Sequence, residues 1–138
     1  MEAYEAKWLL SPQFDEASDF EENISRVIKD GKFGFIDIKG EVIVKPQFEY
    51  AENFHEGVAR VKIDGKYGFI DKAGQMVIKA QFDDAAEFSE GLASVCVDNK
   101  WGFIDKYEDI VIKPQFNFYS YFHDGLASES RDGKSGYI

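Results

Sequence analysis

The sequence repeats itself with a fixed period, and this period constrains the fold more than any local pattern does. Glycine recurs every 34 residues, and the same interval separates four phenylalanines. The residues that keep this step are Gly34, Gly68, Gly102 and Gly136, and Phe20, Phe54, Phe88 and Phe122. Because four such copies fill almost the whole chain of 138 residues, we expect one repeat domain over residues 1–138.

Apolar and polar residues alternate within each copy, which indicates β-strands rather than the helices of other repeats of this length. In "GVARVKID", Ala59, Val61 and Ile63 alternate with basic residues, and the segment ends at Asp-Gly, a hairpin turn signal. A third segment, "QMVIKAQF", is rich in β-branched residues. We therefore expect an all-β protein of four repeats, each with three antiparallel strands and a polar connection. The expected strands, repeated at offsets of one period, are near Val58–Ile63, Tyr67–Asp71 and Met76–Lys79.

The register of the first hairpin depends on the length of its loop. A two-residue loop places Gly68 and Ile70 on the face of Val61, whereas a three-residue loop with a bulge places Tyr67 and Phe69 there. We expect the three-residue loop, because it gathers the aromatic side chains with Val61. Gly68 would then face a neighbouring element where a side chain does not fit.

The segment "KWGFIDKYEDIVIKPQFNFYSYFHDGLAS" and its three sibling copies resemble the bacterial WG repeat family. Units of that family combine aromatic-Gly-aromatic-Ile-Asp, an apolar strand with Lys-Pro-Gln-aromatic, and Phe-x-x-Gly-Leu-Ala. The resemblance covers residues 8–138, although only Trp101 supplies the tryptophan of the name. It implies a β-repeat scaffold for interactions and brings no catalytic residues.

The last copy stops at Ile138, at the end of its second strand. It lacks the third strand, which in the other copies would pair with the second. The segment Lys7–Pro12 aligns with Glu41–Pro46, which is the third-strand position. We therefore expect the N-terminal strand to pair with the C-terminal strand and to close the array as in a β-propeller, which removes both exposed edges. The alternative is an open β-repeat array.

Residues typical of catalysis or metal binding are scarce, so we expect no enzyme activity, no cofactor and no metal site. His55 and His123 are the only histidines, too few for a metal centre. Cys96 occupies the position of Lys62, which we expect to face solvent, and no basic cluster activates its thiol. The recurring acids that we expect to accept hydrogen bonds from turn backbone are Asp37, Asp71 and Asp105.

The net charge of −10 is concentrated in the four connections, residues 13–23, 47–57, 81–91 and 115–125. They contain 13 acids and no Lys or Arg. Because equivalent segments of a repeat fold lie along one edge, we expect a single acidic rim. Such a rim repels nucleic acid and favours a basic protein partner. The rim acids that we expect to meet the partner are Glu52, Glu56, Asp83, Asp84 and Glu87.

The fourth connection, "QFNFYSYFHDG", carries aromatic residues where the others carry acids. Exposed aromatic side chains dominate interface energetics, although here they could instead fill a gap at the closure seam. In the same copy Glu129 and Arg131 replace apolar residues, which predicts either a salt-linked surface strand or a modified recognition face. The aromatic anchors that we expect are Phe118, Tyr119 and Tyr121.

These features favour a non-catalytic protein-binding module whose acidic rim meets a basic protein, with an immunity protein that neutralises a toxin as one such role. The alternative is a carbohydrate- or cell-envelope-binding repeat protein that uses the aromatic patch. No apolar run is long enough for a membrane span, and the start "MEAYEAKWLL" lacks signal-peptide features. We therefore expect a cytoplasmic protein, and the sequence does not predict its oligomeric state.

Overall fold

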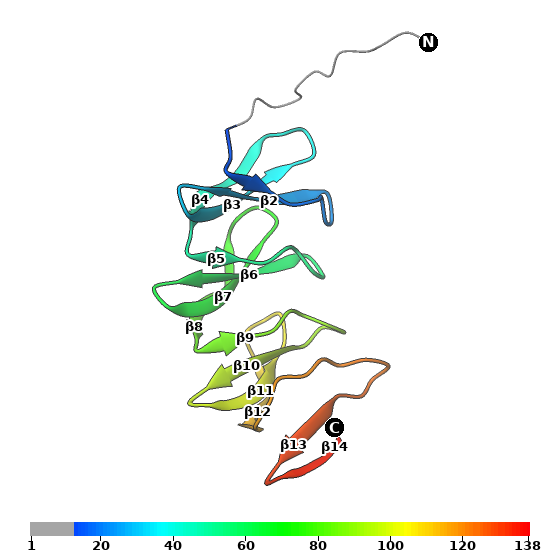
Figure 1. Cartoon of the computed structure of the whole chain (residues 1–138). Helices are drawn as coiled ribbons and strands as arrows, with labels where there is room; N and C mark the ends of the chain where they lie inside the picture. Colours follow the sequence, from blue (N-terminus) through cyan, green and yellow to red (C-terminus); the bar gives the residue numbers. More distant parts are fainter. Residues whose placement is uncertain (1–12) are drawn as a thin grey trace, which may run out of the picture.

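The structure is a computed structural model that describes residues 13–138, and within them it consists of β-strands and turns (Figure 1). Three antiparallel sheets of four strands are followed by a two-stranded hairpin, which confirms the all-β repeat fold. The first sheet contains β1 (Glu16–Ala17), β2 (Ile24–Lys29), β3 (Lys32–Asp37) and β4 (Val42–Phe48). The second contains β5 (Tyr50–Ala51), β6 (Val58–Ile63), β7 (Lys66–Asp71) and β8 (Met76–Phe82). The third contains β9 (Asp84–Ala85), β10 (Ala93–Val97), β11 (Lys100–Ile104) and β12 (Ile110–Phe116), and the hairpin contains β13 (Ser128–Arg131) and β14 (Lys134–Tyr137).

The sheets follow one another along one axis, with the first sheet and the β13–β14 hairpin at opposite ends (Figure 1). The buried clusters lie where consecutive sheets meet: first with second, second with third, and third with the final hairpin. Residues 13–138 therefore form the open array, not the closed ring. The segment Lys7–Pro12, which the closed arrangement requires, lies outside the described residues.

A repeated pair of phenylalanines joins each connection to the sheet before it. In every pair one ring meets the other edge-on, a favourable geometry for aromatic side chains. This contact explains why phenylalanine recurs in the connections with the period of the sequence. The pairs and their centroid distances are Phe35 with Phe54 at 5.0 Å, Phe69 with Phe88 at 4.9 Å, and Phe103 with Phe122 at 4.9 Å.

The first hairpin of each repeat turns through two residues, so the expected three-residue loop is wrong. Asp64 and Gly65 have φ angles of 48° and 78°, as a type I′ turn requires, and this turn matches the twist of the flanking strands. Tyr67 consequently lies opposite Lys62, whose ammonium nitrogen is 5.5 Å from the centre of the Tyr67 ring. The basic side chains of Arg60 and Lys62, rather than Val61, therefore pack on the Tyr67 ring.

The expectation that Gly68 lies where a side chain does not fit is confirmed. A Cβ atom there would lie 2.5 Å from the carbonyl oxygen of Ile78 and 2.7 Å from the backbone nitrogen of Ala80. The close approach coincides with a register shift between β7 and β8 opposite this glycine. At Gly136 of the last hairpin, no described atom lies within 4 Å of such a Cβ.

The structure adds a short strand that the sequence analysis did not predict. Ala51 of β5 pairs with Val61 of β6, and Ala85 of β9 pairs with Val95 of β10. Each connection therefore begins as the edge strand of the next sheet, and both alanines are almost fully buried. The fourth connection has no such strand, and Tyr119 stands there at the position of these alanines.

The recurring aspartates hold the second turn of each repeat, as expected. Asp71 Oδ1 accepts hydrogen bonds from the backbone nitrogens of Ala73, at 3.0 Å, and Gln75, at 2.9 Å. Asp37 and Asp105 make the same contacts in the neighbouring repeats. The side chain therefore stabilises the turn geometry.

Cys96 does not face solvent, contrary to the expectation from its position. The residue is 7% exposed, because Trp101 of β11 and Asp84 of β9 lie opposite it on the two flanking strands. Burial raises the pKa of its thiol, which disfavours the reactive thiolate.

Candidate binding face

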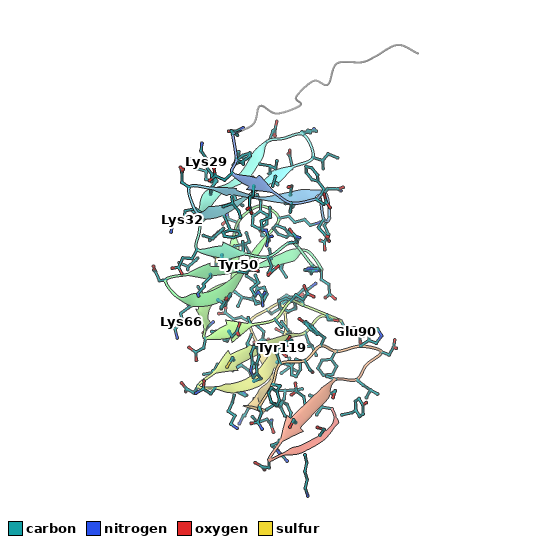
Figure 2. The ribbon with its side chains drawn as sticks, viewed as in Figure 1. Lys29, Lys32, Tyr50, Lys66, Glu90 and Tyr119 are labelled. Carbon is teal, nitrogen blue, oxygen red and sulfur yellow. The ribbon has the colours of Figure 1, made fainter. Side chains whose placement is uncertain are left out.

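The aromatic residues of the fourth connection form a cluster with a tryptophan of β11. The ring centroids of Trp101 and Tyr119 are 5.5 Å apart, and those of Tyr119 and Tyr121 are 5.8 Å apart. Tyr119, which lies over the third sheet in Figure 2, is 55% exposed, and Tyr121 is 41% exposed. Phe118, next to Tyr119 in the chain, is more exposed still. The structure thus brings two predicted anchors into contact and adds Trp101 to them.

A groove of about 200 Å³ runs beside this cluster. Asp84 contributes its only carboxylate, and Arg60 reaches it from the second sheet. Tyr121 is partly buried there, and burial, together with the negative charge of Glu87, raises the pKa of its hydroxyl. The complete lining is Arg60, Asp84, Ala85, Ala86, Trp101, Tyr119 and Tyr121.

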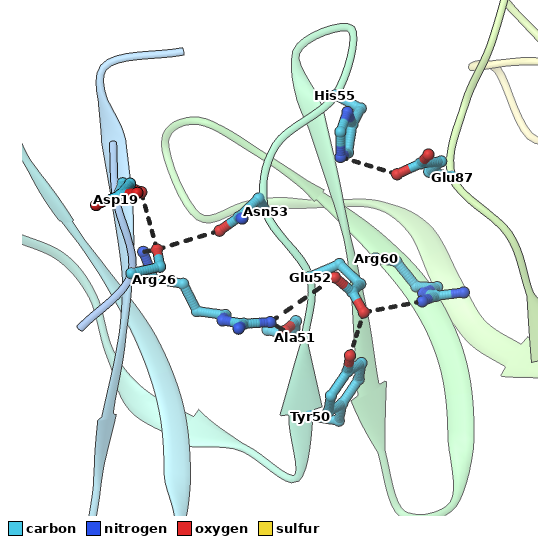
Figure 3. A network of polar contacts seen from close by, with 10 residues as sticks. Asp19, Arg26, Tyr50, Ala51, Glu52, Asn53, His55, Arg60 and Glu87 are labelled. Carbon is cyan, nitrogen blue, oxygen red and sulfur yellow. Dashed lines mark hydrogen bonds and ion pairs between the residues drawn. The ribbon is translucent and has the colours of Figure 1, made fainter. Parts of the chain in front are cut away.

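Glu52, predicted to meet the partner, instead lies inside a polar network between sheets (Figure 3). Its carboxylate oxygens lie 3.2 Å from Arg60 and 3.7 Å from Arg26, and the Tyr50 hydroxyl donates a hydrogen bond to it. Arg26 in turn donates to the backbone oxygen of Ala51, at 2.9 Å, in the next repeat. The charge of Glu52 is therefore largely neutralised within the chain.

Glu56 also links neighbouring repeats. Its carboxylate accepts hydrogen bonds from the backbone nitrogens of Glu90, at 2.7 Å, and Gly91, at 2.9 Å, and it lies 3.4 Å from the Lys106 ammonium. Glu22 makes the equivalent contacts one repeat earlier, with Gly57 and Lys72. These acids act as ties along the array, a role that the sequence alone does not reveal, because their partners come from other copies.

Asp83 and Glu87 are partly exposed, and each contacts one basic side chain. Asp83 pairs with Lys66 and accepts a 3.0 Å hydrogen bond from the backbone nitrogen of Asp98. These two donors lower the pKa of Asp83. Glu87 lies 2.8 Å from His55 Nε2 (Figure 3). Of the five predicted acids, Asp84 alone forms no ion pair with a described residue.

The acids do not form the single rim that was expected. Each connection starts at the edge where the hairpin turns lie, marked by Lys66 in Figure 2, and ends at the edge marked by Glu90. Asp83 binds the hairpin turn at the first edge, whereas Glu90 binds the backbone of Gly125 at the second. The negative charge is therefore divided between two edges, and the aromatic cluster lies between them.

The two histidines lie in separate repeats, where His55 pairs with Glu87 and His123 lies 3.6 Å from its neighbour Asp124. Within residues 13–138, no three His, Cys, Asp or Glu side chains are grouped as a metal site would require. The sequence analysis missed Trp101 as a member of the aromatic face. The two-residue turn is the signal that could have placed it there, because this register sets Trp101 opposite Cys96.

Comparison with known proteins agrees with the repeat architecture. A family model described as "WG containing repeat" matches residues 5–33, 33–67, 67–101 and 101–134. One solved structure, reported under the words "The de novo evolutionary emergence of a symmetrical protein is shaped by folding constraints", aligns with a TM-score of 0.44 and 12% identity, over 99% of this chain and 78% of that chain. No curated protein is significantly similar in sequence. Within the described part of the chain, no helix has the length and apolar character to cross a bilayer.

Proposed function

The chain belongs to the family of WG-containing repeats, and we propose that this member is a non-catalytic module that binds a basic protein. The observation that carries the proposal is the cluster of half-buried Trp101 with the exposed Tyr119 and Tyr121, which lies beside two carboxylates. Asp84 lines the same groove as the two tyrosines, and the charge of Glu87 acts on Tyr121.

The aromatic and acidic residues have different roles in this proposal. Tyr119 and Tyr121 bury large rigid surfaces on binding and so account for most of the affinity, as interface anchors do. The net charge of −10 attracts a cationic surface and raises the rate of encounter. Phe118, exposed beside Tyr119, extends the apolar contact.

The proposed acids differ in how far their carboxylates are already occupied by contacts within the chain. Glu52, Glu56 and Asp83 contribute to the electrostatic field, but their carboxylates are held by neighbouring repeats or hairpin turns. We assign direct contact with the partner to Asp84 and Glu87, which can be neutralised without cutting a Lys or Arg ion pair within the described residues.

The experiment requires the partner, which can be isolated from the native host by cross-linking to the intact chain. Association and dissociation rates are then measured at several salt concentrations. The double variant Asp84→Asn with Glu87→Gln should slow association and flatten its salt dependence, since surface charges act mainly on the encounter rate. Replacing Tyr119 and Tyr121 by Ala should speed dissociation, with a loss of about 2 kcal/mol or more.

A charge-matched control separates the face from the net charge. Glu41→Gln with Asp109→Asn removes the same two charges from exposed turn positions, and should alter the association rate much less. The proposal is wrong if all three double variants bind the partner with the same rates at every salt concentration.

Toxin neutralisation is the form of this function that we propose for a cytoplasmic member. The face formed by Trp101, Tyr119, Tyr121, Asp84 and Glu87 would cover a basic active-site cleft, so the chain should inhibit the toxin with the same sensitivity to Tyr119→Ala as it shows in binding. A partner whose activity is unchanged when the face is occupied would contradict the immunity role and leave the binding module in place.

A second candidate, binding of a carbohydrate or of the cell envelope, is favoured by the groove itself. Trp101, Tyr119 and Tyr121 offer ring surfaces beside Asp84, a combination that can stack on and hydrogen-bond a sugar. Salt distinguishes the two candidates, because glycan binding should be nearly independent of ionic strength, whereas binding of a basic protein should weaken strongly.

A further inference from the structure

The last hairpin buries a carboxyl group at a position where the other repeats bury valine. Glu129 of β13 is 6% exposed, although Val61 and Val95 occupy the same place in the period. Its Oε1 atom is buried and forms no hydrogen bond of normal geometry among residues 13–138. Burial raises the pKa of this carboxyl, and the nearby Ser120 hydroxyl and Ser130 backbone offset part of that rise. The expected salt-linked surface strand is wrong here, because Glu129 forms no ion pair in this range and Arg131 donates instead to Gln115.

A cavity of about 370 Å³ adjoins this carboxyl group. Four serines, two aromatic residues and one acid line it, and its lining contains no Lys or Arg. The lining residues are Phe118, Tyr119, Ser120, Ser128, Glu129, Ser130 and Ser135. Arg131 and Lys134 line a different groove, of about 600 Å³, to which Glu129 also contributes.

This set of side chains matches one class of ligand. An anion would meet the Glu129 carboxyl with no basic group to offset it. A metal ion would find a single carboxylate, fewer charged ligands than such ions usually take. An ammonium group has three donors to satisfy, and the Glu129 carboxylate and the Ser120 hydroxyl beside it can accept two of them, while an aromatic face attracts the positive charge.

Two features of the cavity point to a cation on a flexible chain. Tyr119 lines both this cavity and the groove beside Asp84, so an occupant of the cavity adjoins the aromatic face assigned above to a basic partner. The cavity also leaves room for the alkyl stem of a long side chain along Phe118.

We propose that the cavity beside Glu129 binds the side-chain ammonium group of a lysine that the basic partner inserts between Phe118, Tyr119 and the serines. This inference rests on the proposed function and names the residue type that the partner presents there. Glu129 then gains the hydrogen-bonded counterion that the described chain does not supply.

The test uses a probe in place of the partner, so that the result does not depend on the partner being known. A blocked Gly-Lys-Gly peptide and its norleucine counterpart, which lacks only the charge and its donors, are titrated into the ¹⁵N-labelled chain and followed by NMR. The lysine peptide should shift the amide signals of Glu129 and of the lining serines in a saturable manner. The norleucine peptide should leave these signals unchanged.

Three variants sharpen the result. Glu129→Gln keeps the shape and should weaken lysine-peptide binding by about tenfold or more, because it removes the buried counterion. Glu129→Val restores the residue of the other repeats, so it should fold and also lose binding. Glu41→Gln removes an exposed charge in the first sheet and should bind the peptide like the native chain.

Three outcomes would overturn the inference. The first is equal signal shifts with both peptides, and the second is that Glu129→Gln and Glu129→Val bind the lysine peptide as tightly as the native chain does. The third is that a free polyamine such as spermidine binds more than about tenfold tighter than the lysine peptide and loses this binding when Glu129 is replaced. The last would assign the cavity to a small amine instead of a protein side chain. Failure of the peptide test would contradict the lysine site but not the proposed function, which is tested by the partner-binding rates. Conversely, if replacing Tyr119 and Tyr121 did not change those rates, the proposed function would be wrong even if the peptide bound.

Discussion

The last hairpin buries an ionisable residue at a position where the other repeats bury an apolar one. Where the second and third repeats bury Val61 and Val95, this hairpin buries the carboxyl of Glu129, and burial raises its pKa. The folded chain therefore holds this proton more tightly than the unfolded chain does. By linkage, its contribution to stability is greatest in acid and declines as the pH rises from the ordinary glutamate pKa to the raised one.

Replacing Glu129 by Val should consequently stabilise the free protein in a pH-dependent way. We expect the free energy of unfolding to rise by about 1–3 kcal/mol at neutral pH, since the variant removes a buried carboxylate that has no counterion among the described residues. The gain should shrink below the ordinary glutamate pKa, where the native carboxyl is protonated in both states. Urea unfolding of both chains at about pH 4 and about pH 8 measures it. A gain that is equal at both pH values would show that charge is not the cause.

At the scale of the strand, the third strand of each sheet passes close over the period-setting glycine of the second strand, and this contact joins the two strands. Three of the four period-setting glycines lie under the backbone of the third strand, at contact distances that exclude a Cβ atom. The register shift that brings the strands together recurs in each of the three sheets. Glycine is therefore required by the neighbouring strand rather than by its own φ angle.

The fourth repeat provides a matched control for this requirement. Gly68→Ala would place a Cβ atom 2.5 Å from the Ile78 oxygen, and we expect it to destabilise the fold by about 1–3 kcal/mol. Gly136→Ala meets no described atom within 4 Å and should change the stability by no more than about 0.5 kcal/mol. Equal losses in thermal unfolding would mean that glycine is needed there for another reason, or that a further strand covers Gly136.

The hairpins could be predicted because their signals are local. The alternation around Val61 and the Asp64-Gly65 turn lie in one short segment, and the strands formed where expected. The wrong register came from grouping Tyr67 and Phe69 by hydrophobicity, whereas the type I′ turn decided the pairing. The sequence left the closed and the open arrangement as alternatives, because the angle between successive sheets depends on contacts between repeats.

The aromatic face was predictable in part for the same reason. Tyr119 and Tyr121 break the period, because they stand in the fourth copy where the third has Ala85 and Glu87. Side chains so different in size and polarity cannot make the same contacts as the residues they replace. Which acids form ion pairs within the chain was not predictable, because the basic partners of Glu52 and Asp83 come from strands and turns outside the connections. Counting charges within the connections cannot reveal such contacts.

At the scale of the whole molecule, the open array makes stability depend on neighbouring sheets. Its buried clusters lie between consecutive sheets, so within residues 13–138 each interior sheet is covered on two sides and each end unit on one. In arrays of this kind, stability is roughly the sum of the repeats and their nearest-neighbour interfaces. The final hairpin has the smallest cluster, and every residue of its strand β14 is exposed.

This arrangement predicts a gradient of amide hydrogen exchange. Peptides that cover β13 and β14 should exchange faster than those that cover β6 and β7, because local opening of an end unit breaks one interface and opening of an interior unit breaks two. Exchange of the intact chain, followed by mass spectrometry, measures the gradient, and the first sheet should lie between these extremes. Uniform protection over all four repeats would instead indicate one cooperative unit. If β14 were protected as well as β7, a further strand would have to cover its outer edge, and Lys7–Pro12 is the segment whose sequence matches the third strand of a repeat.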